Sequence, residues 1–221
     1  MKKIAVVLSG CGVYDGTEIH EACAALLALN RAGAQVVACA PSGQQMHVVD
    51  HQKGAPAEGP SRDILTESAR LVRGGIRPLA GLSAREFDGV LLPGGFGAAK
   101  NLCTFAVDGA ACRVHPEVES FLRDAHAMRR PIAAMCIAPV VLARVFGNGD
   151  GPLLTIGSDA PTAALVTAMG ARHQDCAVTG VVVDEAARIA TTPAYMLTDD
   201  IGQVFAGAEE LVKKLLTMCA S

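Results

Sequence analysis

Cys136 stands at a position in the sequence that suits a catalytic nucleophile. It directly follows the apolar run P-I-A-A-M, which predicts a buried strand, and it precedes Pro139, where a helix is predicted to begin. A strand, a sharp turn and a helix together form a nucleophile elbow, which holds one side chain above the end of a sheet. Because the positive end of a helix dipole stabilises a thiolate, we predict that Cys136 has a lowered pKa and is accessible to solvent. In contrast, Cys23, Cys39 and Cys219 lie on apolar periodicities and are predicted to be small buried residues.

A pair of glycines, Gly94 and Gly95, follows the predicted strand at residues 87–92. Such a pair allows positive φ angles and lets backbone N–H groups converge on an anion. Together with the amide of Ile137, the residue after Cys136, both glycines are predicted to form an oxyanion hole. The loop does not match a phosphate-binding loop, because it lacks the Gly-Lys-Ser/Thr ending and the Rossmann spacing.

Two carboxylates in the first loop and helix, Glu18 and Glu21, are candidates for proton transfer to and from the thiol. Thr17 is predicted to cap this helix at its N-terminus, which places both carboxylates in the first turn. The pattern favours Glu21 as the catalytic partner of Cys136 but keeps Glu18 as an alternative.

Other polar residues beside these motifs are predicted to line the pocket: Cys11 and Tyr14 in the first loop, and Asn101 after the glycine pair. The eight cysteines are scattered singly, with no CxxC pair and no His/Cys spacing typical of a zinc site. We therefore expect no bound metal and reduced thiols, which are typical of a cytoplasmic protein.

The elements that must position these residues alternate between strands and helices, which predicts a doubly wound α/β domain with a mostly parallel sheet. Strand, helix and strand follow one another within the first forty residues, and this βαβ unit requires parallel pairing. We expect a single domain over residues 1–221 with an insertion at about residues 41–85, containing an edge hairpin and a helix. The predicted strands are 3–8, 34–40, 46–51, 87–92, 131–135, 153–156, 181–183 and 189–192, and the predicted helices are 17–33, 61–72, 116–128, 139–145, 161–169 and one running into 211–218.

The composition excludes several classes of protein. Hydrophobic residues make up 51% of the 221 residues and charged residues 19%, which is enough apolar material for a packed core. A net charge of −3, no Trp and only two Tyr argue against a nucleic-acid partner. The N-terminal apolar run is shorter than that of a signal peptide, and no stretch approaches the roughly 20 apolar residues needed to cross a membrane.

Four motifs carry a resemblance to a known family: S-G-C-G-V-Y-D-G-T-E-I-H-E, L-P-G-G-F-G-A-A-K-N-L, M-C-I-A-P and T-T-P-A-Y-M. Together they resemble the ElbB branch of the ThiJ/PfpI superfamily over nearly the whole chain. The resemblance implies a flavodoxin-like, three-layer α/β/α fold related to the class I glutamine amidotransferases, and a homodimer. It also implies Cys136 as the nucleophile, Gly94 and Gly95 in the oxyanion site, and Glu21, counted back from Gly33, as the family glutamate.

The same resemblance implies a cofactor-independent glyoxalase of the lyase class, which turns glyoxal into glycolate and methylglyoxal into lactate. No metal, glutathione or nucleotide is required, and the expected partner is a small aldehyde substrate. Protease-like members carry His after the nucleophile where this chain has Ile137, and no late His-x-Glu follows, so peptidase and glutaminase activities are not expected. A redox or carbonyl-stress sensor that uses the same cysteine and an accessory factor in isoprenoid biosynthesis remain the alternatives.

Overall fold

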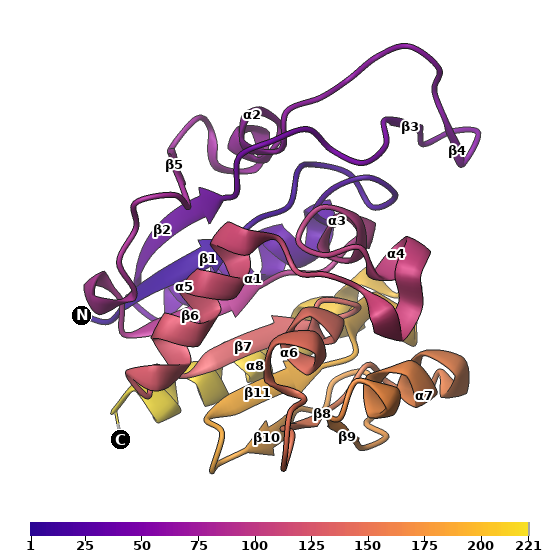
Figure 1. The fold of residues 1–221 in the computed structure, drawn as a ribbon. Helices are drawn as coiled ribbons and strands as arrows, with labels where there is room; N and C mark the ends of the chain where they lie inside the picture. Colours follow the sequence, from indigo (N-terminus) through magenta and orange to yellow (C-terminus); the bar gives the residue numbers. More distant parts are fainter. Residues whose placement is uncertain (221) are drawn as a thin grey trace.

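A seven-stranded sheet forms the centre of the protein in the computed structural model, which describes residues 1–220 (Figure 1). The strand order is β10-β11-β7-β6-β1-β2-β5. Every neighbouring pair is parallel except β10 and β11, which pair antiparallel at one edge. The predicted α/β class with a mostly parallel sheet is confirmed.

The helices and strands of the described residues are, in chain order, β1 (Lys3–Val7), α1 (Ile19–Arg31), β2 (Gln35–Ala40), β3 (Val49–Asp50), β4 (Ala55–Pro56), α2 (Ile64–Ser68), β5 (Ile76–Pro78), β6 (Gly89–Leu92), α3 (Phe96–Lys100), α4 (Phe105–Asp108), α5 (Pro116–Ala127), β7 (Ile132–Met135), α6 (Pro139–Phe146), β8 (Leu153–Leu154), α7 (Ala160–Ala168), β9 (Arg172–His173), β10 (Val182–Asp184), β11 (Ile189–Thr192) and α8 (Ile201–Ala220), with four short 3₁₀ helices between them.

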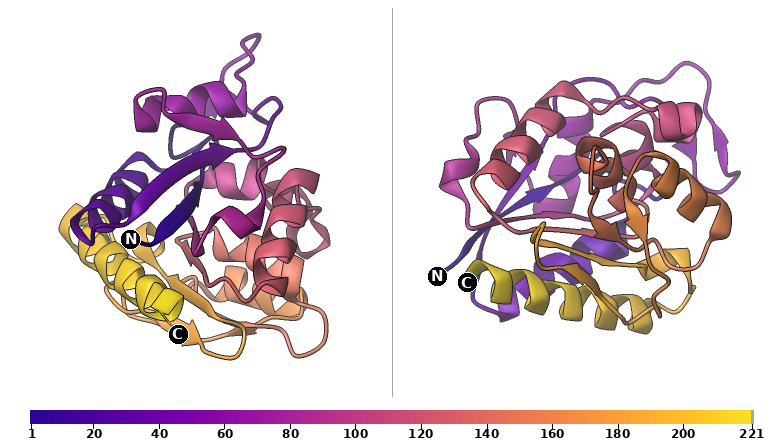
Figure 2. Two further views of the ribbon diagram at one scale, coloured as in Figure 1. Left: turned by 90° about the vertical axis from the view of Figure 1, so that its left-hand side faces the viewer. Right: turned by 60° about the horizontal axis from the view of Figure 1, so that its bottom comes forward.

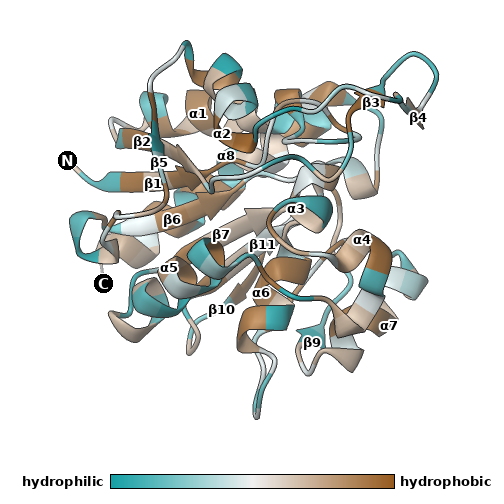
Figure 3. Ribbon diagram, turned by 45° about the horizontal axis from the view of Figure 1, so that its top comes forward, coloured by the Kyte–Doolittle hydropathy of each residue, from teal (hydrophilic) through white to brown (hydrophobic). Residues whose placement is uncertain are grey.

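The central strands consist of short apolar runs because both faces of the sheet are covered. All four residues of β6, of β7 and of β11 are buried, as are four of the five residues of β1. Parallel strands covered on both faces have this composition, whereas a half-exposed strand would alternate. Figure 3 shows these strands as the hydrophobic centre of the molecule.

Helices cover both faces of the sheet and give the three layers. Helices α1 and α8 pack together on one face, where α8 also contacts β6, β7 and β11. Helices α5 and α6 pack against each other on the opposite face (Figure 2). The parallel strands all end at the same edge, beside α3, α4 and the β3–β4 hairpin (Figure 1). In such sheets the functional site lies at this edge. Among the described residues, no helix has both the length and the apolar character that a bilayer crossing requires.

The segment at residues 41–85 differs from the prediction. Strand β5 pairs parallel with β2, so this segment supplies the edge strand of the main sheet rather than only a hairpin and a helix. Strands β3 and β4 form a hairpin that is a separate two-stranded sheet, and β3 is shorter than the strand predicted at 46–51. The predicted helix at 61–72 begins at Ile64, because the Asp63 side chain accepts a hydrogen bond from the N–H of Thr66 and caps the helix there.

The three cysteines predicted to be buried in the core differ in their exposure. Cys39, on β2, is buried as predicted, whereas Cys219 is only partly buried and Cys23 is exposed. The prediction for Cys23 is therefore wrong. Its position on α1 lies between the buried residues Ala22 and Ala24, on the part of the helix that faces solvent.

Candidate active site

Cys136 lies on the turn between β7 and α6, with a φ of 59°. This left-handed conformation is costly for a residue with a side chain, and such strain is found at functional sites. The N–H of Cys136 donates to the carbonyl oxygen of Thr192, which ties the turn to the end of β11. The predicted strand, sharp turn and helix are confirmed.

The sulfur atom is surrounded by three polar partners. It accepts hydrogen bonds from the backbone N–H groups of Gly95 and Ile137, and the thiol donates to the carboxyl group of Glu21. Burial and the charge of Glu21 raise the pKa of Cys136 well above its ordinary value, although the two N–H groups oppose this. The residue is only 7% exposed. The prediction of an accessible thiolate with a lowered pKa is therefore wrong, because loss of water and a neighbouring carboxylate outweigh the amides at the start of α6.

Glu21, in the first turn of α1, is fully buried beside the thiol. Its Oε2 accepts a hydrogen bond of 2.8 Å from the N–H of Gly94, and its Oε1 accepts one of 3.4 Å from the N–H of Tyr195. Burial raises the pKa of Glu21 to about 7, and the hydrogen bond from Cys136 opposes this rise. A carboxyl group with this pKa can both give and take a proton near neutral pH.

Glu18 has a different task from Glu21. It is the N-cap of α1, where its Oε2 accepts a 2.7 Å hydrogen bond from the N–H of Glu21. The predicted cap, Thr17, instead accepts a hydrogen bond at its Oγ1 from the N–H of Ser9. Thr17 is therefore not the cap, because its hydroxyl already holds the first loop against the end of β1. Glu18 lines the cavity described below, but Glu21 is the carboxylate that contacts the sulfur.

The N–H groups of Gly94 and Gly95 have different partners. Gly95 has a φ of 90° and directs its N–H at the sulfur of Cys136, as an oxyanion-hole donor must. The N–H of Gly94 is already bound to Glu21, so the prediction that Gly94 supplies an oxyanion donor is wrong. A Cβ at Gly94 would overlap the Cβ of Cys136 and approach Oε2 of Glu21 to 2.7 Å. Gly94 therefore permits the close approach of the β6 end to the thiol and the carboxylate.

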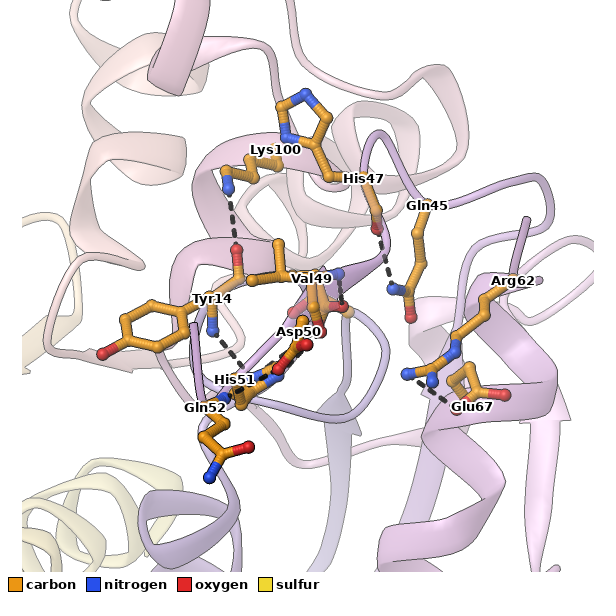
Figure 4. Close-up of polar contacts among 12 residues, drawn as sticks. Tyr14, Gln45, His47, Val49, Asp50, His51, Gln52, Arg62, Glu67 and Lys100 are labelled. Carbon is orange, nitrogen blue, oxygen red and sulfur yellow. Dashed lines mark hydrogen bonds and ion pairs between the residues drawn. The ribbon is translucent and has the colours of Figure 1, made fainter. Parts of the chain in front are cut away.

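A cavity of about 690 Å³ opens above the sulfur, and Cys136, Gly95 and Ile137 form part of its wall. Its other walls come from α3, α4, the β3–β4 hairpin and the segment after β11. Tyr14 lines this cavity, as predicted from the sequence. Figure 4 shows how Tyr14 is held: its N–H donates to Nε2 of His51, and its carbonyl oxygen accepts from Nζ of Lys100.

Cys11 and Asn101 are not among the residues that line the cavity, so these two predictions are wrong. The backbone of Cys11 forms a bridge with Thr17 inside the first loop. The side-chain amide of Asn101 is hydrogen-bonded to backbone groups. Its Nδ2 donates to the carbonyl oxygens of Ser9 and Asp15, and its Oδ1 accepts from the N–H of Met46. Its polar atoms therefore hold loops together and do not face a ligand.

Several cavity residues were not predicted from the sequence, among them Tyr195, Lys100 and His47. Tyr195 was recognisable in principle, because the motif T-T-P-A-Y-M begins in the last two residues of β11, which ends at the same sheet edge as β7. His47 falls inside the strand predicted at 46–51, but the structure places it in the irregular segment before β3. No group of three or more His, Cys, Asp or Glu side chains within residues 1–220 is arranged to hold a metal ion.

Two proteins named mitochondrial are similar to this chain over nearly its whole length. The ES1 protein homolog, mitochondrial, of Rattus norvegicus is 48% identical over 98% of this chain and 84% of the relative. The glutamine amidotransferase-like class 1 domain-containing protein 3, mitochondrial, of Homo sapiens is also 48% identical, over 98% and 83%. The expectation of a cytoplasmic protein is therefore wrong: both relatives, matched over nearly the whole chain, are named mitochondrial. The expectation rested on eight scattered cysteines, a pattern that does not distinguish one reducing compartment from another.

Solved structures with the same fold also match. The crystal structure of an isoprenoid biosynthesis protein with an amidotransferase-like domain from Ehrlichia chaffeensis has a TM-score of 0.92 and 34% identity over 99% of both chains. Glyoxalase III of Candida albicans shares the fold, with a TM-score of 0.63 and 12% identity over 98% and 97% of the chains. The model of the DJ-1/PfpI family matches residues 2–192. This chain, with its cysteine elbow and its glutamate partner, is a member of the DJ-1/PfpI family.

Proposed function

We propose that this protein is a cofactor-independent glyoxalase that converts small 2-oxoaldehydes into 2-hydroxy acids, glyoxal into glycolate and methylglyoxal into lactate. One observation carries the proposal. The Cys136 sulfur lies between two backbone N–H donors and a buried carboxyl group, Glu21, with a pKa of about 7. The family includes a glyoxalase, which supports the same class of reaction.

The first step is attack of the sulfur on one aldehyde carbon. As the S–C bond forms, the thiol proton passes to the Glu21 carboxylate, so the high pKa of the thiol is no obstacle to attack. The aldehyde oxygen becomes negatively charged and is stabilised by the N–H groups of Gly95 and Ile137. Return of the proton to this oxygen gives a hemithioacetal and restores the Glu21 carboxylate.

The second step moves a hydrogen between the two carbons. The Glu21 carboxylate removes the proton from the carbon bonded to sulfur, and the electron pair forms a double bond to the neighbouring carbon. The carbonyl oxygen of that neighbouring carbon takes up the hydroxyl proton of the hemithioacetal, which gives an enediolate. The same carboxyl group then delivers the proton to that neighbouring carbon, which leaves a thioester of the 2-hydroxy acid. Water cleaves the thioester, releases the acid and regenerates the thiol. The sum is one 2-oxoaldehyde and one water giving one 2-hydroxy acid, with no external oxidant or reductant.

The raised pKa of Cys136 weighs against the alternative of a redox sensor, because oxidation by peroxide requires an accessible thiolate. A role in isoprenoid biosynthesis has the printed name of the Ehrlichia protein as its support. The buried carboxyl group of Glu21, which can take the thiol proton as the sulfur attacks a carbonyl carbon, is the feature that favours the glyoxalase proposal.

The test is product formation from glyoxal, measured as glycolate by chromatography. We expect Cys136→Ser to abolish turnover and Glu21→Gln to lower kcat by about 10²–10⁴-fold, the usual contribution of a general acid–base group. Cys23→Ala is the matched control, because Cys23 is exposed on α1 and does not line the cavity. Glycolate formation by Cys136→Ser at the rate of the unmodified protein would refute the proposal.

A further inference from the structure

The cavity above Cys136 is much larger than the smallest substrates of the proposed reaction. Glyoxal has four heavy atoms and fills roughly 120 Å³ if each takes the share of a water molecule, about 30 Å³. The cavity measures about 690 Å³. A pocket of this size suits a ligand with a body several times larger than glyoxal. The residues far from the sulfur therefore have room to contact a substituent that glyoxal lacks.

Charges are distributed unevenly along the cavity. Glu18 lies at the end that holds the thiol, next to the buried carboxyl group of Glu21. Lys100 lies at the opposite end of α3 from Gly95, about 7 Å along the helix axis at the usual rise per residue. His47 also lines the cavity, from the segment before the β3–β4 hairpin (Figure 4). A carboxylate at one end and donor groups at the other orient an asymmetric ligand.

Both groups at the Lys100 end have unused donor capacity. The Lys100 ammonium donates to the carbonyl oxygen of Tyr14 at 2.7 Å. Within residues 1–220 it forms no direct ion pair. Two of its three N–H bonds are therefore left for a ligand. Partial burial lowers the pKa of Lys100, although the more distant Asp15 carboxylate raises it, so the ammonium has lost part of its water. The Nδ1 atom of His47 is buried and has no hydrogen-bond partner within residues 1–220, and such buried polar atoms usually have one.

Apolar side chains also line the cavity. Phe96, Phe105 and Met196 line the cavity, and the Nζ of Lys100 lies 5.5 Å from the centre of the Phe96 ring. An apolar body that passes these side chains would connect the thiol end to the Lys100 end.

We infer that Lys100 and His47 form a subsite for an anionic substituent of a 2-oxoaldehyde whose apolar body packs against Phe96 and Phe105 while its aldehyde reaches Cys136. The inference rests on the proposed function for the identity of the reacting group. The anion recognition itself stands on the geometry of Lys100 and His47.

The experiment compares 4-carboxyphenylglyoxal with its neutral twin, 4-carbamoylphenylglyoxal, by formation of the corresponding mandelates. We expect kcat/KM to be about tenfold or more higher for the carboxylate, the usual value of a charge-assisted hydrogen bond. Lys100→Gln keeps a donor for the Tyr14 carbonyl but removes the charge, and it should bring the ratio of the two kcat/KM values close to one. Lys100→Arg should retain the preference, and His47→Leu should reduce it.

The control is Lys53→Gln, because Lys53 is 77% exposed, pairs with Asp50 and does not line the cavity. It should leave the ratio as it is in the unmodified protein. Equal kcat/KM values for the two compounds in the unmodified protein would overturn the subsite while the glyoxalase proposal stands. If neither compound is turned over, the binding of both compounds to Cys136→Ser, measured by calorimetry, tests the subsite directly. Tighter binding of the carboxylate, lost in Cys136→Ser with Lys100→Gln, supports the subsite without the glyoxalase, and equal binding overturns it.

Discussion

Replacing Glu21 by Gln should change how the stability of the protein depends on pH. Burial raises the pKa of Glu21 from an ordinary value of 4.5 to about 7. Between these values the folded protein keeps a proton that the unfolded chain has already released. The stabilisation from this group is therefore fully present below pH 4.5 and is lost as the pH rises through 7.

The size of the effect follows from the same two values. A pKa difference of one corresponds to about 1.36 kcal/mol, so full ionisation of Glu21 costs the folded state about 3 kcal/mol. Because Glu21 is fully buried, solvent does not screen this cost. The glutamine side chain of the variant stays neutral at every pH, and its amide oxygen can still accept the hydrogen bond from Gly94. The free energy of unfolding of Glu21→Gln minus that of the unmodified protein should therefore be about 2–3 kcal/mol higher at pH 8 than at pH 5, so the variant gains relative stability as the pH rises.

Urea unfolding followed by circular dichroism at the two pH values measures this difference. Taking the variant relative to the unmodified protein cancels the contributions of all other titrating groups. Glu119→Gln is the control, because Glu119 forms an exposed ion pair with Arg123 on α5. A Glu21→Gln effect of the same size at pH 5 and pH 8 would show that the carboxyl group is ionised in the folded protein at both, which contradicts the reasoning.

Three further outcomes are expected. The kcat/KM for glyoxal should fall about tenfold per pH unit below pH 7, because the carboxylate form of Glu21 is the base; a pH–rate profile that is flat from pH 5 to 8 argues against this role. Gly94→Ala should lose glyoxalase activity and about 1–3 kcal/mol of stability, because the new Cβ would overlap Cys136 and Glu21. Glycolate assays measure the activity and thermal unfolding measures the stability. An unchanged Tm would contradict the overlap. Cys136→Gly should be more stable than Cys136→Ala by about 1 kcal/mol in urea unfolding, because glycine adopts a φ of 59° without strain. If Cys136→Ala proves the more stable variant, the turn relaxes to another conformation and the strain argument is wrong.

Local order in the chain was sufficient to predict the frame of the site. An apolar run, one cysteine and a helix start within a few residues define the elbow at Cys136, because each signal depends only on near neighbours. The parallel sheet then follows from the βαβ pattern, and the ends of its strands must meet at one edge. Gly95 and Ile137 were predicted as oxyanion donors on this basis, and the structure directs both N–H groups at the sulfur.

The choice between Glu18 and Glu21 could not be made from the sequence alone. The two carboxylates are three residues apart and share one helix face, so a shift in the helix start exchanges their positions. The predicted cap at Thr17 was wrong because the hydroxyl of Thr17 is held by Ser9, a contact across the first loop. The edge strand β5 was missed for a related reason, since three residues carry too little pattern to be recognised.

The fold class, the elbow and the nucleophile could be predicted from the residue order, because these follow from hydrophobic periodicity and turn chemistry within short windows. The protonation states of Cys136 and Glu21 could not, because they depend on contacts between distant segments. The pKa values of Cys136 and Glu21 depend on how much water the surrounding segments exclude and on how close the two groups come. The size of the cavity and the placement of Lys100 and His47 at its far end depend in the same way on segments distant in the chain.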